Sequence, residues 1–329
     1  MSLAQPLEIG DVRLRNRVVL APMAGLSDAV MRWLAWQFGA GLTVGEMVSS
    51  RSDLWHSHKS EVRRKSFAGS GPRVVQIAGT EPPAMAEIAR RHVDEGAQLI
   101  DINFGCPAKK VCRKAAGSAL MEQPQLIGRI VAAVSGAVDV PVSIKMRTGP
   151  HPDRRNGAEV ARVAEDAGAR SIAVHGRTRA DRFLGEAEYD TIRQIKAAVS
   201  VPVFANGDIT SRTQAERVMR LTGADGVLVG RAAVGQPWLL GTIAGRDVPD
   251  LHDRWQALRW HVEHTHELYG PARGLRTVRK HVSEYLRGFG LGGDVAAFNA
   301  LQDATHQLQF LDDLGSQALS ADQGGRKVA

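Results

Sequence analysis

The chain has 329 residues, 43% of them hydrophobic and 23% charged, which are the proportions of an ordinary globular protein, and its net charge of +7 is moderate. Cys106 and Cys112 are the two cysteines, which excludes a disulfide framework and a four-cysteine zinc site and suits a reducing cytoplasm. The N-terminal segment lacks a cationic start followed by an apolar core, and no apolar run approaches the roughly 18 residues that span a membrane, so we expect neither a signal peptide nor a membrane anchor.

Eight apolar, β-branched runs alternate with segments typical of amphipathic helices, such as Glu81–Glu95 and Asn156–Ala167. The first run is not followed by the G-x-G-x-x-G loop of a doubly wound sheet, so eight strand–helix units favour a closed (β/α)8 barrel, the TIM-barrel architecture, over residues 1–240. The runs are Val18–Ala24, Leu42–Val48, Arg73–Ala78, Leu99–Phe104, Pro141–Met146, Ser171–His175, Pro202–Asn206 and Gly226–Gly230.

A second, smaller domain is predicted after the barrel. Residues 241–250 are rich in Gly, Asp and Pro and are typical of a linker, and three helical patterns follow within an all-helical domain at 241–315. Trp255 and Trp260 are expected in its core. Residues 316–329 are small and polar, which predicts a disordered tail.

The positive charge is unevenly distributed. Residues 241–329 hold 10 Lys and Arg against 11 Asp and Glu, so residues 1–240 hold 32 against 24. Because active sites of such barrels lie at the C-terminal ends of the strands, basic stretches after the fourth, fifth and sixth strands predict a cationic rim for nucleic acid or another phosphorylated substrate. These stretches are Lys109, Lys110, Arg113 and Lys114; Arg147, Arg154 and Arg155; and Arg177, Arg179 and Arg182.

The middle helix of the tail is also basic, and this face is either an ordinary solvated surface or a phosphate-binding one. Its cations are Arg273, Arg276, Arg279, Lys280 and Arg287, against Glu284 alone.

The fourth strand runs into a Gly-Cys-Pro corner. Gly105 and Pro107 bracket Cys106 with one permissive and one rigid backbone position, which predicts a thiol held on a turn. Taken alone, Cys106 is either a small buried side chain at a strand end or a proton donor or nucleophile facing a polyanion.

Other strand ends carry groups suited to a phosphate-bearing ligand. Lys145 lies in an apolar strand, where an ammonium is costly unless it meets an anion or polar group, and His175 and Gln76 end two further strands. Loops after the seventh and eighth strands commonly bind phosphate through backbone N–H groups, which the segments Asn206-Gly207-Asp208 and Gly230-Arg231 can supply. No carboxylate pair suits glycosidase chemistry, and the histidines lack metal-ligand spacing.

In order along the chain, these residues resemble the tRNA-dihydrouridine synthase family, most closely its bacterial B-type enzymes. The resemblance covers all eight barrel units and extends into the tail at 279–285. The matching segments begin at Ala21 (APMAG), Gln76 (QIAG), Asn103 (NFGCPAKKV), Lys145 (KMRTG), His175 (HGRT), Asn206 (NGDI), Gly230 (GRA) and Arg279 (RKHVSEY).

The resemblance implies an FMN-containing barrel with a helical tRNA-binding domain, which reduces uridine in tRNA to 5,6-dihydrouridine with NADPH as electron donor. Hydride would pass from the flavin to C6 of uracil and a proton from Cys106 to C5. A cytoplasmic monomer without an obligate protein partner would suit one polynucleotide substrate. The flavin would contact Pro22, Met23, Ala24, Gln76, Lys145 and His175, and its phosphate Asn206, Gly207, Asp208, Gly230 and Arg231. The tRNA would contact Asn103, Lys109, Lys110, Arg147, Arg177, Arg276, Arg279 and Lys280.

One departure from the family pattern is Cys112, where a non-thiol residue is usual, and it raises the question of oxidative pairing with Cys106. Three alternatives remain open at this point. They are a dihydroorotate-dehydrogenase-like flavoenzyme acting on a free pyrimidine, a phosphate-binding isomerase without redox chemistry, and a non-catalytic RNA-binding barrel. Neither the position of the reduced uridine nor the preference for NADPH over NADH can be predicted from the sequence.

Overall fold

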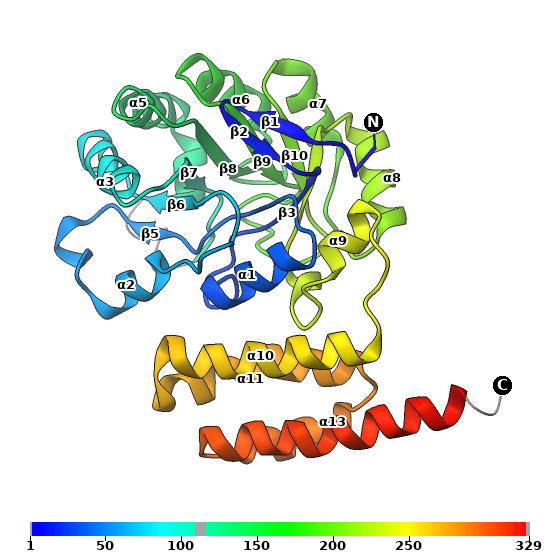
Figure 1. Cartoon of the computed structure of the whole chain (residues 1–329). Coiled ribbons are helices and arrows are strands. Elements are labelled where there is room, and N and C mark those ends of the chain that lie inside the picture. Colours follow the sequence, from blue (N-terminus) through cyan, green and yellow to red (C-terminus); the bar gives the residue numbers. More distant parts are fainter. Residues whose placement is uncertain (1, 109–115, 327–329) are drawn as a thin grey trace.

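Nine parallel strands form one sheet in the order β4-β3-β11-β10-β9-β8-β7-β6-β5 (Figure 1). The structure is a computed structural model that describes residues 2–108 and 116–326. Each predicted run contains at least one strand, and the prediction of a TIM-barrel-like fold is confirmed. The strands are β3 (Val18–Leu20), β4 (Leu42–Thr43), β5 (Val48–Ser49), β6 (Val74–Ala78), β7 (Leu99–Phe104), β8 (Val142–Arg147), β9 (Ser171–His175), β10 (Val203–Asn206) and β11 (Gly226–Val229).

The second predicted strand is two short strands in the structure, and together they close the ring. β4 pairs with β3, β5 pairs with β6, and Val44 bridges Val74 between them. The backbone leaves regular pairing at Glu46, whose buried carboxylate accepts a hydrogen bond from the Gly25 N–H at 2.5 Å. The irregularity therefore ties the second strand to the loop that follows β3.

Helices cover the outside of the ring, and a large apolar core fills the space between the two layers. Local signals set the helix ends: Pro82 occupies the first turn of α3, and α8 ends at Gly223, whose φ of +68° is left-handed. The barrel helices are α1 (Ala29–Gln37), α2 (His58–Arg64), α3 (Pro82–Asp94), α5 (Pro124–Ser135), α6 (Gly157–Asp166), α7 (Asp190–Ala198), α8 (Arg212–Thr222) and α9 (Leu239–Ala244). Short 3₁₀ turns are η1 (Ser52–Leu54), η2 (Gly117–Glu122), η3 (Arg231–Ala233) and η4 (Gly292–Asp294).

An N-terminal hairpin that the sequence analysis did not predict closes the end of the barrel where the strands begin. β1 (Leu7–Ile9) and β2 (Val12–Leu14) pair antiparallel. Leu14 is buried in one cluster with Leu99 and Phe204 from inside the ring. This plug leaves the opposite end, where the strands finish, as the open end of the barrel.

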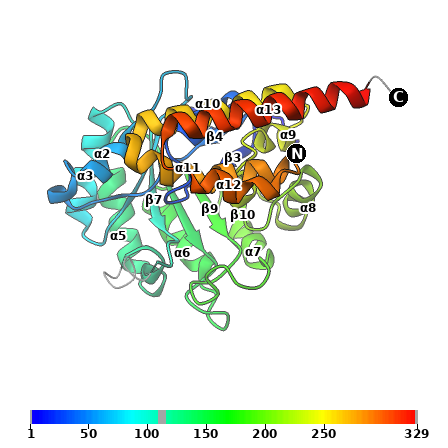
Figure 2. The same ribbon diagram turned by 90° about the horizontal axis from the view of Figure 1, so that it is seen from below.

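The helical region packs on one side of the barrel and leaves the α5–α7 side uncovered (Figure 2). It consists of α10 (Leu251–Tyr269), α11 (Pro271–Gly288), α12 (Val295–Ala300) and α13 (Ala304–Arg326). Its core is continuous with the barrel, since Leu34 and Trp238 belong to the same buried cluster as Leu258. The Trp33 and Trp260 rings stack across this contact at 4.1 Å.

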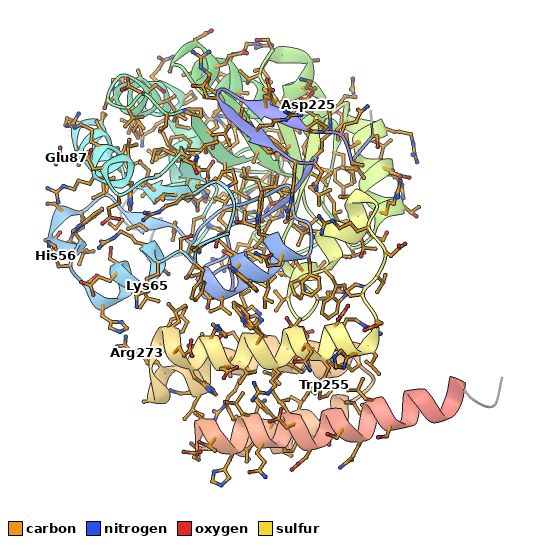
Figure 3. The ribbon with its side chains drawn as sticks, in the orientation of Figure 1. His56, Lys65, Glu87, Asp225, Trp255 and Arg273 are labelled. Carbon is orange, nitrogen blue, oxygen red and sulfur yellow. The ribbon has the colours of Figure 1, made fainter. Side chains whose placement is uncertain are left out.

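The predicted tryptophan positions fit this packing. Trp255 is buried and donates its indole N–H to the Leu311 carbonyl at 3.2 Å, and it lies between α10 and α13 (Figure 3). None of the helices in 2–108 and 116–326 is long and apolar enough to cross a membrane.

Two boundaries differ from the prediction. The segment 241–250 begins as the end of α9, whose Leu240 and Ile243 are fully buried in the barrel core, so the irregular connection starts only at Gly245. The segment predicted to be disordered from Ser316 is helical to Arg326, because α13 continues without a break. Leu314 and Ala318 keep helical spacing and pack against the core of the helical region, an apolar pattern that the polar composition concealed.

Candidate active site

A cavity of about 1030 Å³ opens at the C-terminal ends of the strands, on the side where active sites of this architecture lie. It brings together most of the residues predicted for the site. The lining includes Pro22, Met23, Ala24, Gln76, Asn103, Cys106, Lys145, Arg147, His175, Asn206, Gly207, Asp208, Gly230 and Arg231. Lys109, Lys110 and Cys112 lie outside the described residues.

The Gly-Cys-Pro corner is held by hydrogen bonds on both sides of the thiol. The Cys106 N–H donates to Asn103 Oδ1 at 2.9 Å, and the Cys106 carbonyl accepts from the N–H and the hydroxyl of Ser118. Arg147 Nε donates to the Gly105 carbonyl at 2.7 Å. The backbone around Cys106 is therefore fixed by these hydrogen bonds, although residues 105–108 form no regular turn.

A chain of buried side chains sets the orientation of Asn103. Asp101 accepts hydrogen bonds from Ser143 Oγ at 2.6 Å and from Gln76 Nε2 at 2.7 Å. Gln76 Oε1 in turn accepts from Asn103 Nδ2 at 2.8 Å. Because Asp101 accepts the Gln76 amide, the Gln76 carbonyl faces Asn103 and takes up one of its Nδ2 hydrogens, which leaves the second for a ligand in the cavity.

Burial and charge act in opposite directions on Asp101. Burial raises the pKa of Asp101, whereas the hydrogen bonds from Ser143 and Gln76 and the charge of Lys145 lower it. The net shift is upward, which is the cost of placing a carboxylate beneath the cavity floor.

Lys145 meets a polar partner across the barrel mouth. Its Nζ donates to Asn206 Oδ1 at 3.1 Å, while Asn206 Nδ2 donates to the Leu228 carbonyl at 2.9 Å. Burial and then the charge of Arg147 lower the pKa of Lys145 to about 8, against smaller opposing effects of Asp101 and Cys106. The ammonium is therefore charged at neutral pH and lies within electrostatic reach of the thiol.

His175 is a neutral imidazole in this site. Burial, followed by the charges of nearby cations including Lys145, lowers the pKa of His175 to about 2. Arg177 Nη1 lies 3.3 Å from His175 Nε2, and a guanidinium can only donate. Nε2 therefore accepts, and Nδ1 carries the proton that the ring can offer to a ligand.

Backbone N–H groups suited to an anion lie where β10 and β11 end. Gly207 has φ +131° and Asp208 φ +50°, and η3 begins at Arg231 directly after Gly230. Gly207 must be glycine, because a Cβ atom there would lie 2.7 Å from Ala187 Cβ. These turns follow neighbouring strands and line one concavity at the cavity rim, where barrels of this architecture commonly bind phosphate through backbone N–H groups.

The side chain of Asp208 does not face that concavity as a ligand. Its two oxygens accept from Arg177 Nη1 at 2.9 Å and Nη2 at 2.7 Å, and one also accepts the Ala187 N–H at 2.8 Å. Although burial opposes the charged form, these hydrogen bonds and the charges of Arg177 and Arg231 lower the pKa of Asp208. The contribution of Asp208 to anion binding is therefore limited to its backbone.

Two arginines predicted for an exposed rim are buried instead. Arg147 is 1% exposed and Arg177 3% exposed. Besides Gly105, Arg147 donates to the carbonyls of Thr178 and Arg182, and Arg177 donates to those of Leu184 and Gly185. Guanidinium groups on long side chains reach inward to these carbonyls, so Arg147 and Arg177 brace loops and present no rim surface to RNA.

The predicted cations of α11 differ among themselves. Arg276 and Lys280 are exposed, whereas Arg279 is half-buried and donates to the Leu301 carbonyl at 3.1 Å. Lys280 approaches the cavity from the helical region, since a Cβ atom on Gly25 would lie 3.7 Å from its Nζ. Arg273 lies near the connection between α10 and α11, where it contacts His58 of α2 at 2.7 Å (Figure 3).

Sequence reasoning missed several groups of the site. Met47 lines the cavity from the irregular second strand, and Phe183 lines it from the loop after β9. Phe183 could have been predicted for the site from the sequence, because this aromatic residue directly follows the third basic stretch. Asp101 and Ser143 could not be recognised from the sequence, because a polar residue inside the ring acquires a role only through its hydrogen-bond partners on neighbouring strands.

Comparison with known proteins gives a consistent result. The family model "Dihydrouridine synthase (Dus)" matches residues 19–321. The chain is 49% identical over 314 residues to tRNA-dihydrouridine synthase B of Escherichia coli, covering 93% of this chain and 98% of that protein. It is 49% identical over 333 residues to tRNA-dihydrouridine synthase B of Pseudomonas syringae pv. tomato, covering 98% and 99%.

Solved structures agree on the architecture. A morphinone reductase variant in complex with tetrahydroNAD has a TM-score of 0.56 at 13% identity, covering 77% of this chain and 94% of that one. Histamine dehydrogenase from Rhizobium sp. 4-9 has a TM-score of 0.57 at 14% identity, covering 79% and 50%. At these identities the likeness concerns the fold alone.

Proposed function

Because the chain belongs to the dihydrouridine synthase family, we propose that it reduces specific uridines of tRNA to 5,6-dihydrouridine, with bound FMN and with NADPH as electron donor. The observation that carries the proposal is the cavity itself, where a fixed cysteine, a charged lysine and a neutral histidine face one volume of about 1030 Å³. A tRNA substrate also implies that the enzyme acts in the cytoplasm.

The residues of the cavity suit an FMN-sized ligand. The N–H groups around Gly207 and Gly230 can hold its phosphate, with the exposed guanidinium of Arg231 adding charge. Lys145 and the His175 Nδ1–H can donate to the polar edge of the ring system, and Met23 offers an apolar contact. When bound and reduced, the flavin supplies hydride to C6 of the uracil.

Cys106 would then deliver the proton to C5. An ordinary thiol with a pKa near 8.5 is largely protonated at pH 7 and is a competent acid toward an enolate. The Lys145 ammonium stabilises the thiolate left behind, because it lies within electrostatic reach of Cys106. The thiolate regains its proton from solvent before the next turnover, so the two hydrogens added to the C5=C6 bond are accounted for.

Asn103 and Lys145 are suited to the uracil carbonyls. The polar chain from Asp101 directs an amide hydrogen of Asn103 toward the cavity, and Lys145 supplies a positive charge. Hydrogen bonds to a carbonyl oxygen strengthen as that oxygen gains negative charge in the enolate, so these donors favour the transition state over the ground state.

The helical region supplies a surface for the RNA. Arg276 and Lys280 are exposed on α11, and Lys280 reaches the loop at Gly25 that lines the cavity. Phosphate contacts on this surface would position the nucleotide that enters the active site and offset the cost of removing its base from the stack.

The test is Cys106→Ala in the flavin-loaded enzyme, with Cys112→Ala as the matched cysteine control. We expect Cys106→Ala to retain its flavin and to form dihydrouridine in unmodified tRNA transcripts about 10²- to 10⁴-fold more slowly, the contribution of a positioned general acid. Cys112→Ala should form dihydrouridine normally. Mass spectrometry of digested tRNA measures the product. Full activity of Cys106→Ala would refute its role, and a loaded wild-type enzyme that forms no dihydrouridine would refute the function.

A further inference from the structure

The loop after β9 carries an exposed apolar pair at its tip. Phe183 is 54% and Leu184 76% exposed. In the described part of the chain the other exposed large apolar side chains are Leu54, Leu221 and Val248, each isolated in the sequence. Phe183 and Leu184 are instead adjacent at a loop tip, which makes both side chains available together for contact with a partner.

Buried charge holds this tip in place. Arg147 donates to the carbonyl of Arg182, the residue before the pair, and Arg177 donates to the carbonyls of Leu184 and Gly185. Arg182 itself has φ +53°, a left-handed conformation that a non-glycine residue adopts at some cost. Buried guanidinium groups thus fix the backbone on both sides of the Phe183 ring, and the tip is a rigid projection.

The tip stands at the mouth of the active site. Phe183 and Arg182 line the same cavity as Cys106. The guanidinium of exposed Arg231 lies 5.4 Å from the Phe183 ring centroid, and that of Arg147 lies at the same distance. The His175 ring is 6.2 Å away. Two guanidinium groups therefore lie beside the ring, of which Arg231 is exposed and Arg147 is buried and donates to backbone carbonyls.

An aromatic platform flanked by cations is the arrangement that binds single-stranded nucleic acid, because the ring stacks on a base while the cations contact phosphates. Beside the ring the exposed cations are Arg182 and Arg231, and Glu186 is the exposed acid of the tip. Because the ring lines the mouth of the cavity that is proposed to reduce a uridine of tRNA, its position favours RNA as the occupant.

We propose that Phe183 is a stacking site for a nucleobase next to the target uridine, with Leu184 at its edge and Arg182 beside the connecting phosphate. This inference rests on the proposed function and deepens it. A uridine that leaves its stack exposes the face of its neighbour, and the rigid Phe183 ring replaces the lost contact. The platform thereby holds the RNA open while the target base occupies the cavity.

The experiment compares Phe183→Ala, Phe183→Trp and the control Leu221→Ala, which removes an exposed leucine from α8. Unmodified tRNA transcripts are the substrate, and kcat/KM for dihydrouridine formation is measured by mass spectrometry. We expect Phe183→Ala to lower kcat/KM by about 5- to 150-fold, the range for one lost base–aromatic stack. Phe183→Trp should retain at least wild-type affinity for tRNA, and Leu221→Ala should match the wild type.

A second readout reports stacking directly. Once the reduced uridine is mapped, 2-aminopurine is placed beside it in the transcript. Its fluorescence on binding should indicate stacking with the wild type and Phe183→Trp, and an unstacked base with Phe183→Ala. If the wild type is active and Phe183→Ala has the same kcat/KM, the stacking site is overturned and the proposed function stands. The same conclusion follows if Phe183→Ala loses its flavin while the 2-aminopurine fluorescence stays as in the wild type. An inactive wild type would instead refute the proposed function.

Discussion

The buried ion pair between Arg177 and Asp208 is expected to hold the whole loop between β9 and α7. Arg177 is 3% exposed and Asp208 carries 31% of its side-chain surface in solvent. Arg177→Met keeps the volume and the apolar stem but removes the guanidinium. The change leaves the Asp208 carboxylate without its bidentate partner and removes the donors to the Leu184 and Gly185 carbonyls.

The magnitude follows from that environment. Removing one partner of a buried pair costs about 3–5 kcal/mol, and the partial exposure of Asp208 places this case near the lower end. A local opening energy reduced by about 3 kcal/mol corresponds to amide exchange faster by about 100-fold. The N–H of Ala187 is the most direct reporter, because it donates to Asp208 Oδ2.

Hydrogen–deuterium exchange with mass spectrometry of peptides over 176–188 measures this effect. The matched control is Arg193→Met, which removes an exposed pair with Asp190 whose side chains are 58% and 62% exposed, so its loss should leave exchange in 176–188 unchanged. Faster exchange in Arg177→Met confined to 176–188 is the expected result. Wild-type protection there would refute the view that the pair determines the shape of the loop.

The same pair has a predictable pH dependence. The pKa of Asp208 is lowered in the fold, so its stabilisation is present above the ordinary aspartate pKa and is lost as the pH falls through the lowered value. In Arg177→Met the hydrogen bonds and the charge of Arg177, which lower the pKa of Asp208, are absent, so Asp208 protonates at a higher pH. As the pH falls, the protection of 176–188 should therefore begin to change at a higher pH in the variant than in the wild type.

Two further predictions concern binding. Because Lys145 has a pKa of about 8, it loses its charge as the pH rises from 7 to 9, and FMN affinity measured by flavin fluorescence should fall over that range. Lys145→Met should bind FMN weakly, with an affinity that does not change between pH 7 and pH 9. An affinity that falls with pH in Lys145→Met as it does in the wild type would contradict the assignment. Replacing Arg276 and Lys280 by Ala should reduce the slope of log K for tRNA against log salt by about 1.5, or 0.7–0.9 per phosphate contact. Arg129→Ala on α5 is the control, and an unchanged slope in the double variant would remove α11 from the interface.

Much of the barrel could be predicted because its strands are continuous apolar runs, the pattern of a parallel sheet covered on both faces. Leu99–Phe104 and Ser171–His175 match β7 and β9 at both ends. The second strand could not be predicted as two pieces, because the partner of Glu46 at its break, the Gly25 N–H, comes from another loop of the chain. The N-terminal hairpin was missed because its strands have three residues each, too few to show an alternating pattern.

The positions of the site residues followed from topology, because parallel strands of one ring end on the same side. The directions of their side chains did not. Whether Gln76 faces a ligand or Asp101 depends on an inward-facing neighbour one strand away. The polar chain beneath the cavity floor therefore became apparent only with the coordinates.

Counting cations overestimates the surface available to RNA. Among the described arginines of the basic stretches, Arg147 and Arg177 are buried, Arg155 pairs with Glu188 at 2.9 Å and Arg179 pairs with Glu122 at 2.6 Å. A guanidinium offers five donors in a fixed plane, so it can fasten a loop by its carbonyls in a way that lysine cannot. The cations after β8 and β9 therefore act first on the shape of the protein. They fix the backbone of the Phe183 tip, so the exposed cations that remain for the proposed contact with RNA are Arg182 at the tip and Arg276 and Lys280 on α11.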